Sequence, residues 1–597
     1  MNFSSFSATV GLMHIKFILL AELAVVAFLL ILWRRLFPKV KLKAQVLVVL
    51  VGILPLVSIL RLGTYQSGDL SLHVYRAMDF YSVLSEGKLV PLWAGQLNGR
   101  FGYPLFEFIY PLPYYLISLF HWWGISFIAS VKLLLATGFL LSGLTMYYWV
   151  KYETDDDRAG LAAALFYLFA PYHLVNLHFR VAIGEVLALA FLPLVFLTTC
   201  RVIKNSSLTN IVAGGLALAG LLLSHQAVFA LAIPVLVVYF ILKLTLIKKN
   251  RLRYRRLVSG VGLGLMGLGL SAFHWLPAVA ESKFTHQVFM NKVEYLSLSD
   301  LLYSPWRGGF LFQGSGGELS FLIGYSQLVL MGLALMLVFR KKFSAASWPL
   351  VLLCLITIAA LVLMMLPASW PVWQLFPLLL RFQFSYRILA VVILVISFLA
   401  GMVFKTIKWN WLTVGWCAAT VLYTGLNWGN RSSLPQVNDA VLRRELPTST
   451  IRGEGFSAAT PIFVSNSQLL KLNQTDTGGQ MEIITGQGSL ENISHSSTDH
   501  EYKIKAKTDL WVSANVLYYP GWQVIDNGQS VKIDFQKPDY EGVITFKLSP
   551  GSHQVKVLLT DTPMRRTAKL VSLLTMALIF GMFGARRLLP KFEILAS

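Results

Sequence analysis

The chain has 597 residues, of which 56% are hydrophobic and only 13% are charged, and its mean hydropathy is +0.62. The surface of a soluble protein needs about twice that charged fraction, so the composition excludes an ordinary soluble protein. The formal net charge of +22 is high enough for a nucleic-acid-binding protein. The basic residues, however, gather in short clusters at the ends of apolar runs, which is the positive-inside pattern of membrane proteins, and no nucleic-acid partner is expected.

Apolar runs long enough to cross a bilayer recur along most of the chain. A membrane-spanning helix needs about 20 apolar residues, and by this measure the sequence predicts about thirteen spans. In chain order they are 17–33, 44–61, 127–150, 159–177, 183–200, 208–224, 226–247, 257–277, 320–339, 348–367, 386–404, 410–428 and 567–585. The sequence therefore predicts a polytopic α-helical membrane protein.

The basic clusters fix the predicted orientation of these spans. Residues 34–43, 248–256, 340–342 and the tail after 585 are rich in Lys and Arg and are placed in the cytoplasm. Counting inward and outward from them places the N-terminus outside and the C-terminus in the cytoplasm. The same count leaves 62–126, 278–319 and 368–385 as outer loops of a transmembrane domain that covers 1–428.

The apolar stretch 105–125 cannot cross the membrane without breaking this alternation. It contains Pro111 and Pro113 and many aromatic residues, and Pro104 directly precedes it. Such a composition suits an interfacial or re-entrant helix.

Residues 429–566 differ from the rest of the chain because they are polar, with acidic and basic residues in rough balance. Alternating apolar and polar residues predict four strands, separated by turn residues such as Asp526–Asn527–Gly528. The predicted strands are Trp511–Val516, Val531–Phe535, Val543–Leu548 and Val555–Leu559. This pattern predicts an extracytoplasmic β-sandwich domain, followed by a final span and cytoplasmic tail in 567–597.

Ionisable residues are costly near a membrane and are candidate functional residues by default. Asp69 and His73 lie four residues apart in the first outer loop, where a helix would place them on one face. The carboxylate of Asp69 would serve as a general base toward an acceptor hydroxyl, or as a ligand of a divalent metal ion. Its alternative role is that of a plain helix cap.

Further candidates for substrate binding lie in the predicted outer loops. Arg180 precedes an inward helix and would grip a phosphate, or would simply pair with Glu185. Arg381 and Arg387 precede another inward helix and would bind a lipid-linked phosphate or anchor to lipid headgroups. Three more basic residues and one acid complete the predicted set: His73, Arg76, His225 and Glu107.

Several stretches resemble a known family of bacterial membrane proteins. GDLSLHVYRAMDFYSVLSEGKLVPLWAGQLNGRFGYPLFEFIYPLPYYL, ALFYLFAPYHLVNLHFRVAIGEVLALAFLPL and LSHQAVF are similar to the family labelled 6-pyruvoyl-tetrahydropterin-synthase-related. RFQFSYRILAV, YYPGWQVIDNG and LSPGSHQVKV resemble the related YfhO-type membrane proteins. Together these stretches are spread over most of the chain.

The resemblance implies the architecture of GT-C glycosyltransferases, which use a polyprenyl-phosphate-linked sugar and carry an acidic residue in the first outer loop. By position that residue is Asp69. The implied partners are membrane lipids, the polyprenyl-phosphate-sugar donor, and an envelope glycan or lipid acceptor. Two other functions stay open: transport of a lipid or polysaccharide, and envelope assembly without catalysis.

Overall fold

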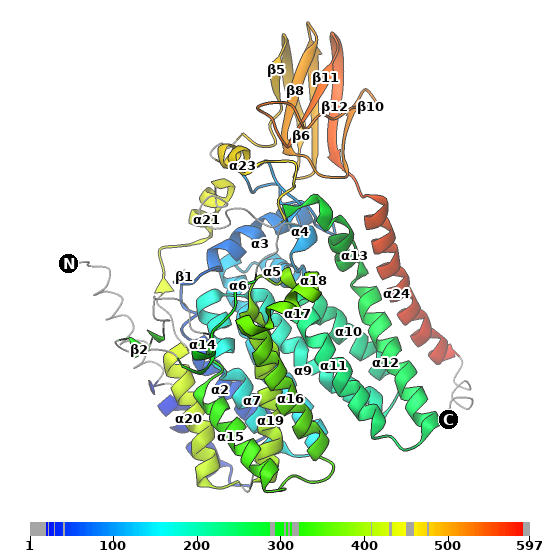
Figure 1. Ribbon diagram of the computed structural model, residues 1–597. Coiled ribbons are helices and arrows are strands. Elements are labelled where there is room, and N and C mark those ends of the chain that lie inside the picture. The colour runs from blue at the N-terminus through cyan, green and yellow to red at the C-terminus, as the bar shows by residue number, and fades with distance from the viewer. Residues whose placement is uncertain are drawn as a thin grey trace, which may run out of the picture. The chain divides into compact units, whose positions relative to one another are not determined.

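The fold is described from a computed structural model, in which the chain divides into two compact units (Figure 1). The first unit combines Met1–Leu70, Ile128–Gly267 and Lys292–Asn438, and the second combines Ser71–Phe127, Leu268–Asn291 and Asp439–Ser597. The structure describes residues 20–21, 23–28, 30–39, 42–286, 293–303, 306–307, 311–312, 321–407, 409–428, 433–448, 459–473 and 477–588.

The first unit is built almost wholly of helices. Its long helices are α2 (Ala44–Ile53), α6 (Phe127–Thr154), α7 (Asp157–Leu168), α9 (Ile183–Lys204), α10 (Leu208–Ser224), α11 (Gln226–Thr245), α12 (Asn250–Leu270), α15 (Tyr325–Phe339), α16 (Trp348–Met365), α19 (Leu389–Thr406) and α20 (Trp411–Trp428). Short helices and turns join them: η1 (Leu54–Leu56), α8 (Pro171–Leu174), η2 (Val175–Arg180), α14 (Leu298–Leu302), η5 (Pro367–Ser369), α17 (Trp370–Leu375), α18 (Pro377–Leu380) and η6 (Ser385–Ile388). Two pairs of two-residue strands are antiparallel: β1 (Thr64–Tyr65) with β4 (Ser433–Leu434), and β2 (Trp306–Arg307) with β3 (Leu311–Phe312).

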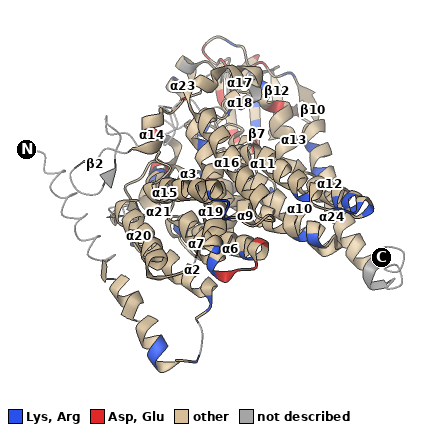
Figure 2. Ribbon diagram, turned by 60° about the horizontal axis from the view of Figure 1, so that its bottom comes forward, with Lys and Arg blue, Asp and Glu red and all other residues tan. Residues whose placement is uncertain are grey.

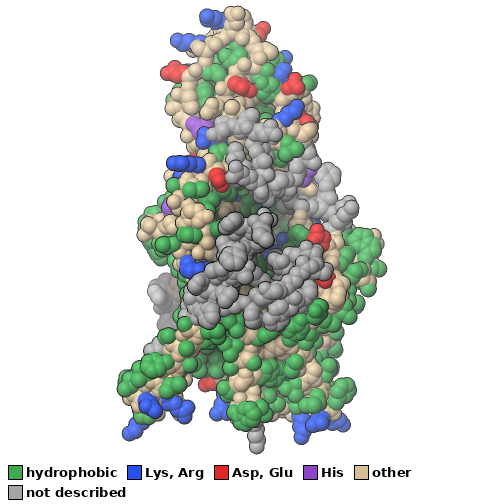
Figure 3. Space-filling model, turned by 90° about the vertical axis from the view of Figure 1, so that its left-hand side faces the viewer, with side chains coloured by type: hydrophobic (Ala, Val, Ile, Leu, Met, Phe, Trp, Pro, Cys, Tyr) green, Lys and Arg blue, Asp and Glu red, His purple; other side chains and the backbone are tan. Residues whose placement is uncertain are grey.

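Helix α19 forms the core of the first unit. Every side chain from Leu389 to Phe404 is buried, and the helix packs against α7, α15 and α16. A helix that is apolar on all faces is stable when other helices surround it. Helices α11 and α16 are equally apolar but largely exposed, with only 22% and 28% of their spans buried. Exposed hydrophobic side chains of this kind cover much of the lower half of Figure 3, as expected for a surface that faces lipid.

Six helices in the described part of the chain are long and apolar enough to cross a membrane, or eight if each of two bent helix pairs is one span. One bent pair is α7 followed by Pro171–Arg180, with an angle of 52°, and the other is α12 followed by α13. Three shorter apolar helices are Ala44–Leu56, Leu208–Ser224 and Tyr325–Phe339. The predicted spans from 44–61 onward are thus mainly helical, and the count of about thirteen stays a prediction. The part of 17–33 that the structure describes is helical as well.

Charged residues mark the ends of these helices. Figure 2 shows basic residues gathered at the start of α12 and acidic residues at the turn between α6 and α7. The basic residues belong to the cluster 248–256 and the acidic ones to Asp155–Asp157. Both groups lie at ends of predicted spans, where polar residues are expected.

The second unit contains helices from three separate parts of the chain. They are α3 (Leu70–Ser85), α4 (Leu105–Phe108), α5 (Leu112–Trp122), α13 (Ala272–Glu281), η3 (Ser282–Phe284), α21 (Asp439–Glu445), η7 (Leu446–Thr448), α23 (Asn466–Asn473) and α24 (Pro563–Leu588). The predicted interfacial segment 105–125 forms α4 and α5, and neither helix is long enough to span a membrane. Pro111 caps α5 and Pro113 lies in its first turn, where proline is tolerated, so the break before α5 follows from the sequence.

Residues 482–559 form two antiparallel sheets. Their strands are β5 (Glu482–Thr485), β6 (Gly488–His495), β7 (Asp499–Ala506), β8 (Leu510–Leu517), β9 (Trp522–Asp526), β10 (Gln529–Val531), β11 (Val543–Leu548) and β12 (Gly551–Leu559). The five-stranded sheet has the order β10-β9-β12-β7-β6, and the three-stranded sheet has the order β11-β8-β5. Alternate residues of β7 and β12 are buried, whereas β8 is buried along nearly its whole length.

Three of the four predicted strands coincide with β8, β11 and β12. The fourth, Val531–Phe535, is wrong, because β10 ends at Val531 and only Asp534 makes a further isolated bridge, to Thr545. The predicted turn is confirmed: Asn527 and Gly528 have φ angles of 48° and 84° in the β9–β10 hairpin. These left-handed conformations favour Asn followed by Gly.

The predicted topology is testable because the three cysteines, Cys200, Cys354 and Cys417, are all buried and give a low labelling background. Single cysteines replacing the exposed Gln66 and Trp123 should both react with a membrane-impermeant thiol reagent on intact cells. A cysteine replacing the exposed Lys249, in a cluster placed in the cytoplasm, is the matched control and should react only after the cells are opened. Labelling of either outer-loop position only from the cytoplasmic side would contradict the topology.

Candidate active site

A buried carboxylate, that of Glu185, lies at the centre of the polar contacts of the first unit. Glu185 is in the first turn of α9, and its side chain is only 1% exposed. Its Oε1 is 2.9 Å from Nη2 of Arg180, and its Oε2 accepts hydrogen bonds from the hydroxyl of Tyr172 at 2.5 Å and the amide of Asn176 at 3.1 Å. A buried charge is stable only when it is paired and hydrogen-bonded in this way. The start of a helix also favours a negative charge.

The backbone before α9 is irregular, and it places the side chain of Arg180 beside the carboxylate of Glu185. Residues Val175–Arg180 form a π-helix, a conformation that is rare and frequent at functional sites. Val181 follows in the left-handed region, with φ 58° and ψ 46°, and its side chain is fully buried. A β-branched residue in that region is strained, so the surrounding structure must impose it. The amides of Val181 and Ala182 both donate to the carbonyl of Asn176, which holds the turn.

A second guanidinium group, that of Arg387 in η6, approaches the same carboxylate. Its Nε is 3.8 Å from Oε1 of Glu185, and its Nη1 donates to the carbonyl of Phe382 at 2.8 Å. The two arginine side chains are 12% and 19% exposed, so neither is fully screened by water. Two arginines therefore share one carboxylate, and the cluster has an excess of positive charge.

Aromatic rings and a histidine complete this cluster. The guanidinium of Arg180 lies over the ring of Tyr386, 4.8 Å from its centre, and Tyr386 stacks on Phe321. His225 caps α11, because its Nδ1 accepts the amide of Val228, and its Nε2 is 3.9 Å from Glu185. An Nδ1 that accepts a hydrogen bond carries no proton, so His225 is neutral and adds no charge to the cluster.

Asp69 is attached through its backbone to the segment that carries Arg180. The amide of Gly68 donates to the carbonyl of Phe179 at 2.7 Å, and the amide of Asp69 donates to the carbonyl of Arg180 at 3.1 Å. Asp69 is half-buried and directly precedes α3. The fold thus brings the loop of the predicted base to the predicted phosphate ligand, although the two residues are far apart in sequence.

The other predicted site residues lie elsewhere. His73 and Arg76 belong to α3 in the second unit, where Nδ1 of His73 is 2.9 Å from the hydroxyl of Tyr114. Arg381 is exposed in the turn before η6. The predicted site residues therefore fall into two groups. One group surrounds Glu185 in the first unit, and the other belongs to the second unit.

Glu107 takes part in a different cluster of the second unit, where two carboxylates share one arginine. Arg565 is buried, with its Nη2 3.1 Å from Glu107 and 2.5 Å from Glu281, and its guanidinium lies over the ring of Tyr519. Burial raises the pKa of Glu107 to about 8; Arg565 opposes the rise and Glu281 adds to it. Burial therefore favours the protonated form of Glu107. The cluster joins α4, α13 and the first turn of α24, which indicates a structural role.

The sequence left open a divalent metal ion, and the residues that the structure describes were the ones available to hold it. In the residues that the structure describes, no three His, Cys, Asp or Glu side chains are placed to hold a metal ion together. A bound divalent ion needs several oxygen ligands directed at one point. The described residues do not fit such a centre.

Comparisons with known proteins match most of the helical region. The family described as "6-pyruvoyl-tetrahydropterin synthase related domain; membrane protein" matches residues 106–426, which is more than half of the chain. An uncharacterized protein of Lactococcus lactis is 25% identical over an alignment of 277 residues, and the match covers 43% of this chain and 44% of the relative. The chain thus spans less than half the length of this curated relative.

Three solved structures of arabinosyltransferases also match. The mycobacterial arabinofuranosyltransferase AftD has a TM-score of 0.44 and 15% identity over 67% of this chain and 27% of its own. Arabinosyltransferase EmbB from Mycobacterium smegmatis has a TM-score of 0.35 and 10% identity over 88% of this chain and 63% of its own. An AftD variant, R1389S, has a TM-score of 0.39. All these TM-scores lie below the range in which two chains share a fold.

Replacing Glu185 by Gln tests whether the buried ion pair holds this cluster together. The amide keeps the shape of the carboxylate but leaves Arg180 buried without its counter-charge. Removing one partner of a buried ion pair costs about 3–5 kcal/mol, so Glu185→Gln should unfold at a clearly lower temperature in detergent.

The matched control is Asp157→Asn. It breaks an exposed pair with Lys151, whose nitrogen and oxygen are 2.8 Å apart, and exposed pairs contribute about 0–1 kcal/mol. Equal unfolding temperatures for wild type and Glu185→Gln would refute the structural role of Glu185.

Proposed function

The chain belongs to the 6-pyruvoyl-tetrahydropterin synthase related family of membrane proteins, and we propose that it is a glycosyltransferase acting at the outer face of the membrane. Its donor would be a sugar linked to a polyprenyl phosphate, and its acceptor an envelope glycan or lipid. The basic clusters support the outer face, because they assign Asp69, Arg180 and Arg387 to outer loops.

The observation that carries the proposal is the excess of positive charge around Glu185. Arg180 already has a counter-ion in that carboxylate, so Glu185 acts by positioning this arginine. Arg387 is farther away, at 3.8 Å, and its Nε makes no hydrogen bond with the residues that the structure describes. A guanidinium with an unused donor and a second one fixed beside it suit the binding of a phosphate group.

The loop of Asp69 supplies the second element of the proposal. Its amide is bonded to the carbonyl of Arg180, so a donor phosphate at the arginines would lie near this loop. A general base must come within hydrogen-bonding reach of the acceptor hydroxyl. The attachment of Asp69 to this segment supports that role.

In the proposed step, the acceptor oxygen forms a bond to the anomeric carbon of the donor sugar. The bond between that carbon and the phosphate oxygen breaks, and its electron pair leaves with the phosphate. The acceptor proton passes to the carboxylate of Asp69. Arg180 and Arg387 stabilise the negative charge that develops on the leaving phosphate. Attack from the face opposite the phosphate inverts the configuration at the anomeric carbon.

The two sheets of residues 482–559 complete the proposal. We assign them to a β-sandwich outside the cytoplasm that binds the acceptor or covers the donor. The chain between α20 and α24, which contains the sheets, runs from one predicted outer end to another, which supports this location.

Replacing Asp69 by Asn separates the catalytic role from the role of a helix cap. Asn keeps the shape and caps a helix as well as Asp does, but it is not a base. Loss of a general base typically lowers the rate by about 100- to 10,000-fold. Asp69→Asn should therefore lose transfer of labelled sugar from a polyprenyl-phosphate donor by that factor, with an unchanged unfolding temperature.

The matched control is Asp155→Asn, at an acidic turn assigned to the cytoplasm, where Asn also tolerates the observed φ of 55°. It should transfer sugar at the wild-type rate. A stable Asp69→Asn protein with near-normal transfer would remove Asp69 from the chemistry. Failure of the wild type to transfer from any donor would favour transport or envelope assembly instead.

A further inference from the structure

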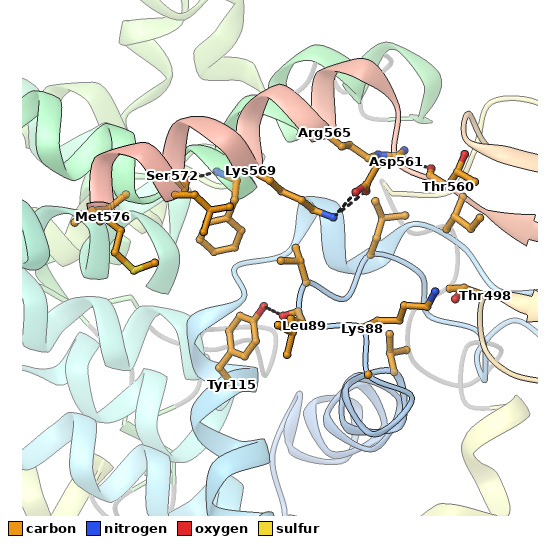
Figure 4. A pocket seen from close by; sticks show the side chains of 18 residues that line it. Lys88, Leu89, Tyr115, Thr498, Thr560, Asp561, Arg565, Lys569, Ser572 and Met576 are labelled. Carbon is orange, nitrogen blue, oxygen red and sulfur yellow. Dashed lines mark hydrogen bonds and ion pairs between the residues drawn. The ribbon is translucent and has the colours of Figure 1, made fainter. Parts of the chain in front are cut away.

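A pocket of the second unit is lined by none of the residues of the cluster around Glu185. It has a volume of about 690 Å³, within the range of about 300–1,000 Å³ that is usual for sites of organic ligands. Figure 4 shows that its walls come from α24, from the segment after α3, and from the end of β12. The apolar side chains that line it include Val83, Leu89, Leu270, Phe273, Leu573 and Met576.

One side of the pocket belongs to the predicted last membrane span. Only 11% of the α24 span is buried, and its apolar surface starts directly after the basic first turns. Leu573 and Met576 line the pocket and are still 57% and 44% exposed. A pocket that opens along the exposed face of such a helix is accessible from the hydrocarbon region of a bilayer.

The charged residues of the pocket are paired, with one exception. Lys569 binds Asp561 at 2.7 Å, and Arg565 is held by the two carboxylates described above. Lys88 lines the pocket and is exposed, and its ammonium group makes no ion pair or hydrogen bond with the described residues. Among the charged groups that line the pocket, the ammonium group of Lys88 is thus available to bind a ligand.

A second unused polar group lies beside Lys88. Figure 4 shows the Lys88 side chain extended toward Thr498, whose Oγ1 is buried and has no hydrogen-bond partner among the described residues. The carboxylate of Glu86 binds Ser497, the residue before Thr498. It accepts hydrogen bonds from the amide and the hydroxyl of Ser497 at 3.0 and 2.8 Å. The Glu86 carboxylate therefore points to Ser497 and forms hydrogen bonds with its two neutral donors.

We propose that this pocket binds an anionic phospholipid, with an acyl chain against α24 and α13 and the phosphate at Lys88 and Thr498. The apolar walls match a hydrocarbon chain, and burying each methylene group contributes about 0.8 kcal/mol. An ammonium group and a hydroxyl are donors that suit a phosphate oxygen. The basic first turns of α24 place this end of the pocket at headgroup depth, where anionic lipids concentrate near Lys and Arg.

Binding of two fluorescent phospholipids to the full-length protein in neutral detergent tests the proposal. Phosphatidylglycerol should bind more tightly than phosphatidylcholine with the same chains. Lys88→Gln should weaken phosphatidylglycerol binding about tenfold and leave phosphatidylcholine unchanged, because a charge-assisted hydrogen bond is lost. Met576→Trp should fill the pocket and weaken both lipids.

Two matched controls separate the pocket from the general surface. Leu574→Trp changes an exposed residue of the same helix, and Lys505→Gln removes an exposed lysine of β7; neither residue lines the pocket, and both variants should bind like the wild type. The Lys88 variant alters an exposed side chain and should fold even if Met576→Trp does not.

Three outcomes would overturn the proposal. They are equal affinity of the wild type for the two lipids, equal losses in the pocket variants and their controls, and displacement by glycerol phosphate as effective as by the lipid. The last result would identify a site for free phosphate. Because the measurement is binding and not sugar transfer, its failure would leave the proposed enzymatic activity unaffected.

Discussion

The buried carboxylate of Glu185 is the interaction on which the polar centre of the first unit depends. A negative charge at 1% exposure in a helical membrane protein is stable only with counter-charges and donors around it. These partners come from α8 and the π-helix, which both precede α9, and from η6, which lies far along the chain. The strained Val181 and the position of Arg180 follow from this requirement. The same backbone segment then holds the loop of Asp69 by two hydrogen bonds, so one ion pair positions the whole candidate site.

The two charged clusters differ in the ratio of arginines to carboxylates. Around Glu185, two arginines face one carboxylate, which leaves a net positive charge for an anion. Around Arg565, two carboxylates face one arginine, and burial raises the pKa of Glu107. The substrate-binding role of Glu107 stays a prediction, and its contact with Arg565 is that of a buried ion pair.

Apolar runs and basic clusters were sufficient to predict the helical segments, because both are local signals. Alternation identified β8, β11 and β12, whereas β6 and β7 were missed because Lys, Glu and Asn occupy their exposed positions and dilute the pattern. The pair Arg180–Glu185 was open to prediction, since the residues are neighbours at a helix start. The hydrogen bonds from Tyr172 in α8 and Asn176 in the π-helix could not be predicted, because no sequence pattern marked the irregular backbone before α9. The approach of Arg387 and of the Asp69 loop depends on tertiary packing.

The central claim is that the paired arginines of the first unit bind the phosphate of a lipid-linked sugar donor. The most direct measurement is a structure determined with a non-hydrolysable polyprenyl-phosphate-sugar analogue bound to the wild-type protein. The account predicts phosphate density within hydrogen-bonding distance of Arg387 and Arg180, with the sugar facing the loop of Asp69. Phosphate density at another place in the molecule, with the arginines still bound only to Glu185 and their present neighbours, would contradict it.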